Sequence, residues 1–218
     1  TISTGFATDF VWIKSRDVAR NNYLYDSIRG ANNQLISQST DSETTVANRM
    51  TGFDSNGFNV GTDGEVNNIN EDYVSWNWKA GGTPSINTDG TITSLVSANQ
   101  AAGFSITSYN HTTTSGTFSV GHGLGNPPEL VFFKCLVTSN SSWMTYYASD
   151  ETKSLVLDSS GAAGAAGQYW PTSPSSSVFN FGTAWASYFA YYGGPSIMYS
   201  FTSISGYSKV SSYSGTGA

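Results

Sequence analysis

The chain repeats a short strand pattern, and this repetition constrains its fold more than any other feature. The run Phe10-Val11-Trp12-Ile13-Lys14 has a counterpart 120 positions later in Leu130-Val131-Phe132-Phe133-Lys134. After a polar turn, Tyr23-Leu24-Tyr25-Asp26 has a counterpart, again 120 positions later, in Trp143-Met144-Thr145-Tyr146. An internal repeat at a fixed offset indicates a folding unit that occurs more than once in the chain. The repeat predicts a duplicated module in which strand, loop and next strand keep one length.

Three further segments return with slightly different offsets, as expected if loops changed length while strands did not. They are Gly57 to Gly61 with Val178 to Gly182, Tyr73 to Trp78 with Ser196 to Phe201, and Phe104 to Tyr109 with Ser208 to Tyr213. The predicted strands are short, rich in aromatic and β-branched residues, and bounded by Gly, Asn, Asp and Pro. Within Tyr73 to Trp78, Trp76 and Trp78 share a face and are expected to anchor the core.

Composition supports an all-β fold. Charged residues make up 11% of the 218 residues, against about 25% in an average globular protein. Aromatic residues reach 14%. The best helix candidate is Thr40 to Met50, where Thr40 or Asp41 could cap a first turn containing Glu43. Two further strands are expected, at 91–96 and 117–120.

The predicted architecture is two tandem antiparallel β-sandwich modules of jelly-roll type, related by internal duplication, each with its own core. Gly81 to Pro84 reads as the boundary. The first module then covers residues 1–82 and the second covers 83–205. Residues 206–218 are expected to complete the first module.

Charge and hydropathy exclude several partners. A formal net charge of −6 with nine Lys plus Arg provides no basic stripe for a phosphate backbone, so nucleic acid is not an expected partner. No run approaches the roughly 18 apolar residues that span a bilayer, and no export signal is recognisable. The single cysteine, Cys135, is predicted to fill the core, because a lone Cys at the end of an apolar run behaves as a small hydrophobe.

No residue set points to catalysis, a cofactor or a metal. His122 lies among glycines, as a turn residue does, and His111 lies in a Thr-rich loop. Asp54-Ser55-Asn56-Gly57 looks like part of a calcium loop, but the later acidic ligands are missing, so a turn is favoured. A polysaccharide-degrading enzyme would need two convergent carboxylates, which a sequence does not reveal.

Aromatic side chains supply the candidate ligand or interface residues. One group follows Ala184 and ends in a Gly-Gly-Pro turn, and a second precedes Pro171; together they are Tyr169, Trp170, Tyr188, Phe189, Tyr191 and Tyr192. Tyr and Trp are favoured where a ring stacks on a sugar or packs against a partner. Packing against the same module is the alternative for both groups. If these rings contact a partner, the segment from Tyr188 to Pro195 should be covered in the assembled state.

Several motifs resemble a repeated domain in structural proteins of tailed phages, especially those of marine cyanobacteria. The motifs lie at 10–17, 54–61, 73–82, 87–94, 103–109 and 121–130, and the segment Gly206 to Tyr213 resembles the junction between repeats of that family. The resemblance spans most of the chain but weakens at 161–167 and 184–195. It implies a virion protein without catalytic residues to transfer.

The expected function is therefore non-enzymatic and structural, in a fibre, spike or decoration on the virion surface that contacts the host, other virion proteins or other copies of itself. A lectin-like module for host cell-surface glycan is the alternative, and an enzyme is third. Two further expectations concern the repeat itself. Trp12 and Phe132 should occupy matching core positions, and Ser208 to Tyr213 should supply a strand missing from the first module, in its own chain or in a neighbouring copy.

Overall fold

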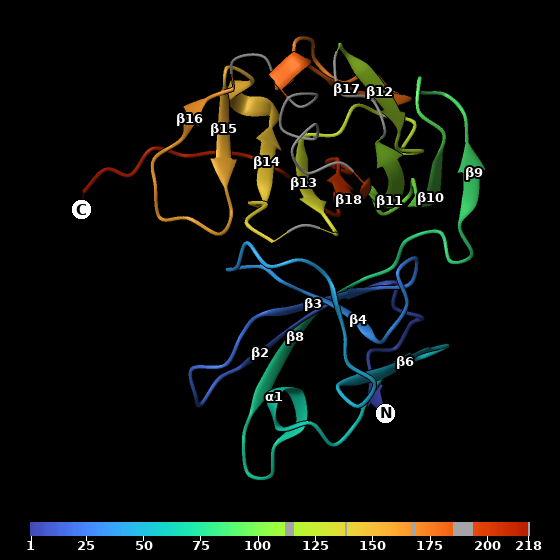
Figure 1. Ribbon diagram of the computed structural model, residues 1–218, viewed down its shortest axis with the longest axis vertical. Coiled ribbons are helices and arrows are strands. Elements are labelled where there is room, and N and C mark those ends of the chain that lie inside the picture. The colour runs from blue at the N-terminus through green and yellow to red at the C-terminus, as the bar shows by residue number, and fades with distance from the viewer. Residues whose placement is uncertain (112–115, 138, 167–168, 185–193, 218) are drawn as a thin grey trace.

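The structure is a computed structural model that describes residues 1–111, 116–137, 139–166, 169–184 and 194–217. It is nearly all β, with antiparallel sheets, as the sequence predicts. Two lobes are stacked along the long axis (Figure 1). The first lobe contains β1 to β8 and α1, and the second contains β9 to β18.

A five-stranded sheet forms the centre of the first lobe, in the order β5-β4-β3-β2-β8. Its strands are β2 (Phe10–Ser15), β3 (Tyr23–Asp26), β4 (Asn33–Ile36), β5 (Thr44–Thr45) and β8 (Tyr73–Trp78). A three-stranded sheet, β1-β7-β6, covers its outer face, with β1 (Ile2–Ser3), β6 (Met50–Asp54) and β7 (Gly57–Val60). The short helix α1 (Gly64–Asn67) lies beside it, and its N-cap Asp63 accepts a hydrogen bond from the Glu65 amide at 2.9 Å.

An eight-stranded sheet forms the second lobe, in the order β16-β15-β14-β13-β18-β11-β10-β9. Its strands are β9 (Ser85–Asn87), β10 (Ser94–Asn99), β11 (Phe104–His111), β13 (Leu130–Cys135), β14 (Met144–Tyr147), β15 (Lys153–Val156), β16 (Gly164–Ala165) and β18 (Gly194–Phe201). The pair β12 (Phe118–Gly121) and β17 (Val178–Phe181) covers its outer face, and a 3-10 turn, η1 (Ala148–Asp150), follows β14.

The two large sheets share one strand order and nearly one set of registers. Phe10 pairs with Trp78 as Leu130 pairs with Phe201, and β16-β15-β14-β13-β18 follows the order of β5-β4-β3-β2-β8. The predicted correspondence of β8 with β18 is thereby confirmed. Trp12 and Phe132 occupy matching register positions, and both rings are partly buried. Descent from a duplicated module stays a prediction, as does the domain boundary between residues 82 and 83.

One predicted alignment is wrong by a residue. Val11 pairs with Tyr25 and Val131 pairs with Tyr146, so β3 and β14 correspond with an offset of 121. The loop after β13 therefore has one residue more than the loop after β2. The two turns can differ in length because they lie outside the ladder.

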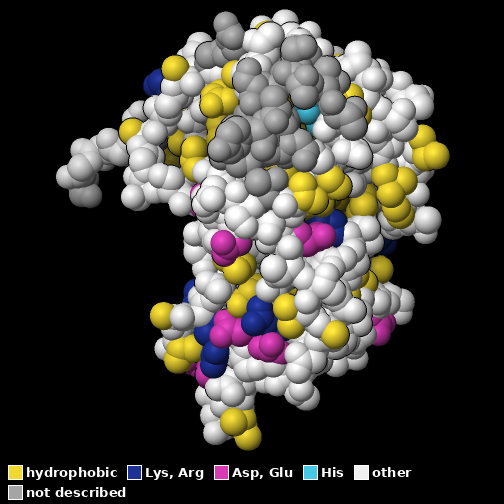
Figure 2. Space-filling model, in the orientation of Figure 1, with side chains coloured by type: hydrophobic (Ala, Val, Ile, Leu, Met, Phe, Trp, Pro, Cys, Tyr) yellow, Lys and Arg dark blue, Asp and Glu magenta, His cyan; other side chains and the backbone are white. Residues whose placement is uncertain are grey.

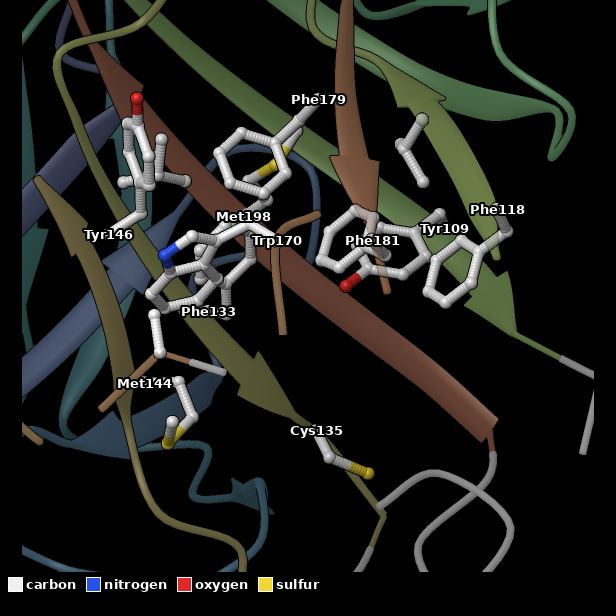
Figure 3. Close-up of a cluster of buried hydrophobic side chains, with 13 residues drawn as sticks. Tyr109, Phe118, Phe133, Cys135, Met144, Tyr146, Trp170, Phe179, Phe181 and Met198 are labelled. Atoms are coloured by element: carbon white, nitrogen blue, oxygen red, sulfur yellow. The ribbon is translucent and has the colours of Figure 1, made fainter. Parts of the chain in front are cut away.

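Three apolar clusters alternate with the sheets. The first lies between the five-stranded sheet and its outer cover and includes Val11, Ile13 and Phe58. The third lies between the eight-stranded sheet and β12-β17, where Phe133, Phe179, Phe181 and Trp170 interlock (Figure 3). The second lies between the lobes and combines Phe10, Leu24 and Leu35 with Phe104, Trp143, Ile197 and Tyr199. Each lobe thus has its own core, and a further core is shared.

This layering explains the composition of β2 and β13. A strand that is buried on both faces has a continuous apolar sequence, whereas a strand with one solvent-exposed face alternates apolar and polar residues. Val11 and Ile13 face the outer cluster, while Phe10 and Trp12 face the shared core. Cys135, at the end of β13, is buried in the third cluster, as expected of a core thiol.

The predicted helix at Thr40 to Met50 is wrong. The segment contains β5 and the first residue of β6 instead. The amide of Glu43 donates to the Leu136 carbonyl at 2.8 Å, and the amide of Val46 donates to the Asn32 carbonyl at 2.8 Å. Tertiary pairing therefore replaces the helical bonds, and the β-branched run Thr44-Thr45-Val46 favours an extended chain.

Two other predictions need correction. The strand expected at 91–96 begins three residues later, as β10. Trp76 is 47% exposed and does not anchor the core. Trp78 does pack against the shared core. The reason is the place of Trp76 on β8, an edge strand along which Trp76 lines an open groove.

Candidate functional site

An aromatic pocket of about 590 Å³ opens where the shared core reaches the surface. The first sheet contributes Phe10, Trp12 and Trp78, the second contributes Phe104, Leu130, Phe132 and Phe201, and the segment from Tyr207 to Val210 forms the rim. We call it the interlobe pocket. Figure 2 shows that the surface is hollowed between the lobes on the left of the view.

The walls of the interlobe pocket are rings in mutual contact. Phe104 lies 4.9 Å from Phe201 and 6.2 Å from Trp78, measured between ring centroids. Phe132 meets Phe201 edge to face at 5.8 Å. Apart from Phe104 on β11, these rings occupy corresponding register positions of the two sheets, so two equivalent sheet faces build most of the pocket.

The polar groups at the pocket are few. The indole Nε1 of Trp12 is buried and has no hydrogen-bond partner among the described residues. A buried indole N–H normally finds an acceptor, because a buried donor without a hydrogen bond costs free energy. Tyr207 is 73% exposed on the rim, beside the exposed Lys209. The pocket therefore offers aromatic stacking surfaces, with Tyr207 and Lys209 as the exposed polar groups on its rim.

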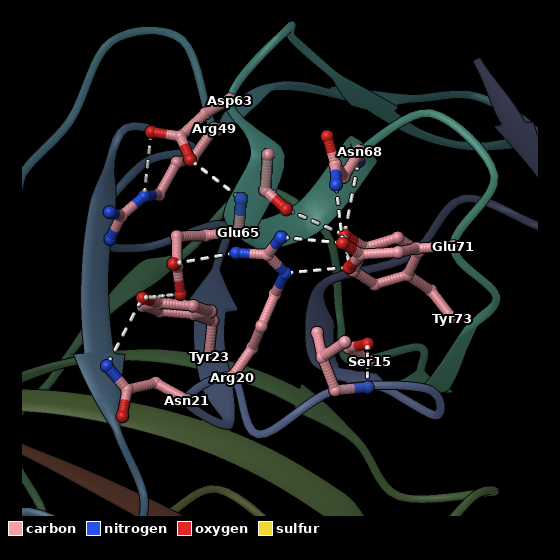
Figure 4. A network of polar contacts seen from close by, with 12 residues as sticks. Ser15, Arg20, Asn21, Tyr23, Arg49, Asp63, Glu65, Asn68, Glu71 and Tyr73 are labelled. Atoms are coloured by element: carbon pink, nitrogen blue, oxygen red, sulfur yellow. Dashed lines mark hydrogen bonds and ion pairs between the residues drawn. The ribbon is translucent and has the colours of Figure 1, made fainter.

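A charged cluster lies at the far end of the first lobe, around Arg20 (Figure 4). Arg20 binds Glu71 through two hydrogen bonds of 2.7 Å and Glu65 through one of 3.0 Å. The hydroxyl of Tyr23 donates to Glu65 at 2.8 Å, and that of Tyr73 donates to Glu71 at 3.0 Å. The Arg20 bonds lower the pKa of Glu71 to about 2.

This Arg20 cluster is unsuited to acid catalysis. A glycosidase needs one carboxyl group with a raised pKa, so that it is protonated near neutral pH. Glu71 has the opposite shift, and its oxygens accept bonds from Arg20 and Tyr73. The cluster instead fastens α1 and β8 to the loop after β2.

The two histidines contribute to folding contacts. His122 is buried; its Nδ1 accepts a bond from the Leu124 amide at 3.2 Å and its Nε2 lies 3.1 Å from the Ser175 carbonyl. Burial lowers its pKa, so the neutral form is favoured. His111 is buried at the end of β11, with its ring 4.2 Å from that of Phe118.

Metal and membrane sites receive no support. Across the described ranges, no group of three or more His, Cys, Asp and Glu side chains could hold a metal ion. Asp54 to Gly57 forms the turn between β6 and β7, where Asp54 accepts bonds from Ser55 and Asn56. In the part of the chain that the structure describes, no helix has the length and apolar character to cross a membrane.

The aromatic residues proposed from sequence have different positions. Trp170 is 5% exposed and packs in the third cluster, where its Nε1 donates to the Glu151 carbonyl at 3.1 Å. Tyr169 is partly buried against that cluster. Tyr188, Phe189, Tyr191 and Tyr192 lie outside the described residues. The structure therefore assigns Trp170 to core packing instead of a surface contact.

Sequence reasoning missed the interlobe pocket. Its walls come from segments that are far apart in the sequence, and each segment by itself has the pattern of a core strand. The signal available was the pair Trp12 and Phe132, which the repeat marks as equivalent.

The whole chain, residues 1–218, matches one family profile, described as a domain of unknown function (DUF7483). No curated protein and no solved structure matches the chain. Because the match covers its full length, the protein belongs to this family.

Proposed function

We propose that this protein is a non-enzymatic structural component of a tailed-phage virion, placed on the particle surface in a fibre, spike or decoration. The observation that carries the proposal is the shared core, in which two sheets of one order pack on each other through equivalent faces. Repeat proteins stack similar units so that neighbouring units bury a continuous core. The resemblance of the sequence motifs to phage structural proteins supports the same role.

The charged side chains also support a scaffold. Arg29 is 3% exposed at its side chain and bonds to Asp26 at 2.5 Å and to Glu43 at 2.8 Å. Together with the Arg20 cluster, these contacts use charges to fix loops, and they leave the described carboxylates of both clusters committed to internal partners.

Particle localisation tests this proposal. The protein should co-purify with intact particles of the virus that encodes it, and a reconstruction of those particles should contain density for the two stacked lobes. Presence in infected-cell lysate together with absence from purified particles would contradict the proposal.

A glycan-binding module is the second candidate, favoured by the interlobe pocket. Aromatic rings stack on the apolar faces of sugars, and the exposed ring of Tyr207 stands at the rim of the pocket. A glycan array tests it with the wild-type chain and a Tyr207→Ala variant, which removes this ring from the rim. Binding that weakens in the variant supports the candidate. Absence of any bound glycan on the array rejects it.

A further inference from the structure

The two lobes differ beside β8 and its counterpart β18, in the strand that pairs with the second side. In the second lobe, β18 is paired on one side with β13 and on the other with β11. In the first lobe, β8 pairs with β2, and among the described residues no strand pairs with its other side. An unpaired edge exposes backbone donors and acceptors that can bind a further strand.

A groove runs along this open edge. It has a volume of about 550 Å³ and lies between the residues of β8 from Ser75 to Trp78 and the segment from Ile2 to Phe6. The equivalent place in the second lobe is occupied by β11. A strand entering the groove would repeat the arrangement of the second lobe.

The first lobe has a second hollow, at the position where the second lobe has a buried tyrosine. Tyr109 on β11 is 3% exposed, and its ring lies 5.8 Å from that of Phe181 on β17. The counterpart of Phe181 in the first lobe is Val60, which lines a pocket of about 250 Å³ together with Tyr73 and Ile13. The outer core of the first lobe thus lacks the ring that closes the third cluster.

The C-terminal segment has the sequence that fits this gap. Gly206-Tyr207-Ser208-Lys209-Val210-Ser211-Ser212-Tyr213 follows Gly103-Phe104-Ser105-Ile106-Thr107-Ser108-Tyr109 with one inserted residue, Lys209. The glycines that begin both segments have left-handed backbones, with φ of 66° at Gly103 and 76° at Gly206. Tyr213, the counterpart of Tyr109, is 94% exposed.

Within its own chain this segment does not form a strand on β8. Backbone bonds between Ile204 and Ser208 turn the chain after β18, and Val210 to Ser212 then lie beside Tyr147 and Leu155 of β14 and β15. These strands are on the opposite side of β18 from β11. The end of the chain projects past them (Figure 1), so its path leads away from its own β8.

We propose that residues 206–214 of one copy bind as a strand to the open edge of β8 in a second copy. By the register of β11 with β18, and with the inserted Lys209 forming a β-bulge, Tyr207 would lie opposite Trp78 and Ser211 opposite Ser75. Tyr213 would lie opposite Tyr73 and fill the hollow beside Val60. The inference rests on the proposed assembly role, for which it names the contact. Such a head-to-tail contact gives a ring if it closes and a filament if it does not.

Cysteine cross-linking between copies tests the register. Two single variants, Ser75→Cys and Ser211→Cys, are mixed under mild oxidation, because opposite residues in an antiparallel pair lie close enough for a disulfide. A heterodimeric disulfide is expected, and the native Cys135 does not interfere because it is buried. Ser214→Cys, which falls three positions out of register, is the matched control and should not cross-link with Ser75→Cys. Circular dichroism establishes that each variant is folded.

Sedimentation of the wild type and of Tyr213→Ala provides the second measurement. The wild type should associate as its concentration rises, and Tyr213→Ala should associate about tenfold or more weakly. Oligomers without the Ser75–Ser211 disulfide would overturn the strand exchange and leave the assembly role intact. A wild type that stays monomeric at all concentrations would also overturn the strand exchange, whereas the virion role is decided separately by particle localisation. A third protein carries Ser75→Cys and Ser211→Cys in the same chain. A disulfide formed within this one chain at high dilution would overturn exchange between copies.

Discussion

The hydroxyl of Tyr199 on β18 donates a 2.6 Å hydrogen bond to Oδ2 of Asp26 at the end of β3, across the shared core. The same carboxylate accepts from Arg29 Nε at 2.5 Å, and Arg29 reaches the Tyr199 oxygen at 3.2 Å. All three side chains are buried. This triad joins the last strand of the second sheet to the first lobe, so the two lobes should unfold together.

Tyr199→Phe should lower the free energy of unfolding by about 1.5 to 3 kcal/mol, the usual range for a hydrogen bond to a charged group. The ring remains, so packing in the shared core is unchanged. Denaturant unfolding followed by tryptophan fluorescence measures the loss. Tyr207→Phe, whose hydroxyl is on the exposed rim, is the matched control and should change stability little. Equal effects of the two substitutions would argue against a coupling triad.

The ammonium of Lys134 is buried between the lobes and should make stability depend on alkaline pH. Burial lowers its pKa from 10.5 to about 8, although its Nζ donates to the carbonyls of Ser141 and Ser39. Between pH 8 and 10.5 the unfolded chain holds a proton that the folded chain has lost, so stability rises with pH. Relative to Lys134→Met, the wild type should gain about 2 to 3 kcal/mol from pH 7 to pH 10.

The measurement is urea unfolding of both proteins across that pH range. Buried tyrosines, whose pKa is raised, lower the stability of both proteins above pH 10, and the comparison removes their effect. Lys14→Met, at the equivalent position of β2, removes the same charge from a partly buried site and is the control. Parallel pH profiles for wild type and Lys134→Met would contradict the prediction.

Glu71 should contribute to stability at neutral pH and lose that contribution in acid. Its pKa is about 2 in the folded chain, against 4.5 for the free group, because Arg20 bonds to the ionised form. The contribution is present above pH 4.5 and disappears as the pH falls through 2. Urea midpoints of the wild type and Glu71→Gln should therefore differ at pH 6 and converge near pH 2. A constant difference would show that the Arg20 contacts do not depend on this charge.

Phe104→Ala should destabilise the chain by about 3 to 5 kcal/mol, the range for a buried aromatic residue. Its ring contacts Phe10, Trp78 and Phe201 in the shared core. Trp76→Ala removes a larger side chain from a half-exposed site and should cost less. Thermal unfolding ranks the two variants, and the reverse order would place the centre of the core elsewhere.

Much of the fold was predictable because strand patterns depend on local chemistry. β2, β3, β13 and β14 combine β-branched and aromatic residues between polar turns, and the repeat predicted that β18 corresponds to β8. The shared core was not predictable in the same way, since Phe10 and Phe104 each look like a residue of a separate module. The helix expected at Thr40 to Met50 failed for a related reason, as backbone bonds to Asn32 and Leu136 decide its conformation.

The candidate site was less predictable than the fold. The preference of Tyr and Trp for interfaces makes Trp170 a candidate contact residue, yet its ring packs in the core, which is the alternative that the sequence leaves open. Trp12 and Phe132 were expected in cores, and they line the interlobe pocket. A pocket made by packing two sheets depends on their relative placement, which no single segment encodes.

The central position of β18 has a consequence for how the protein folds. Both of its neighbours, β11 and β13, are made before it, and β13 precedes it by more than fifty residues. Until β18 inserts between them, each neighbour has an unpaired edge, and such edges recruit other chains. Contacts of long sequence separation also slow folding. During synthesis, the eight-stranded sheet therefore remains two incomplete halves, and aggregation competes with folding until residues 194–201 have been added.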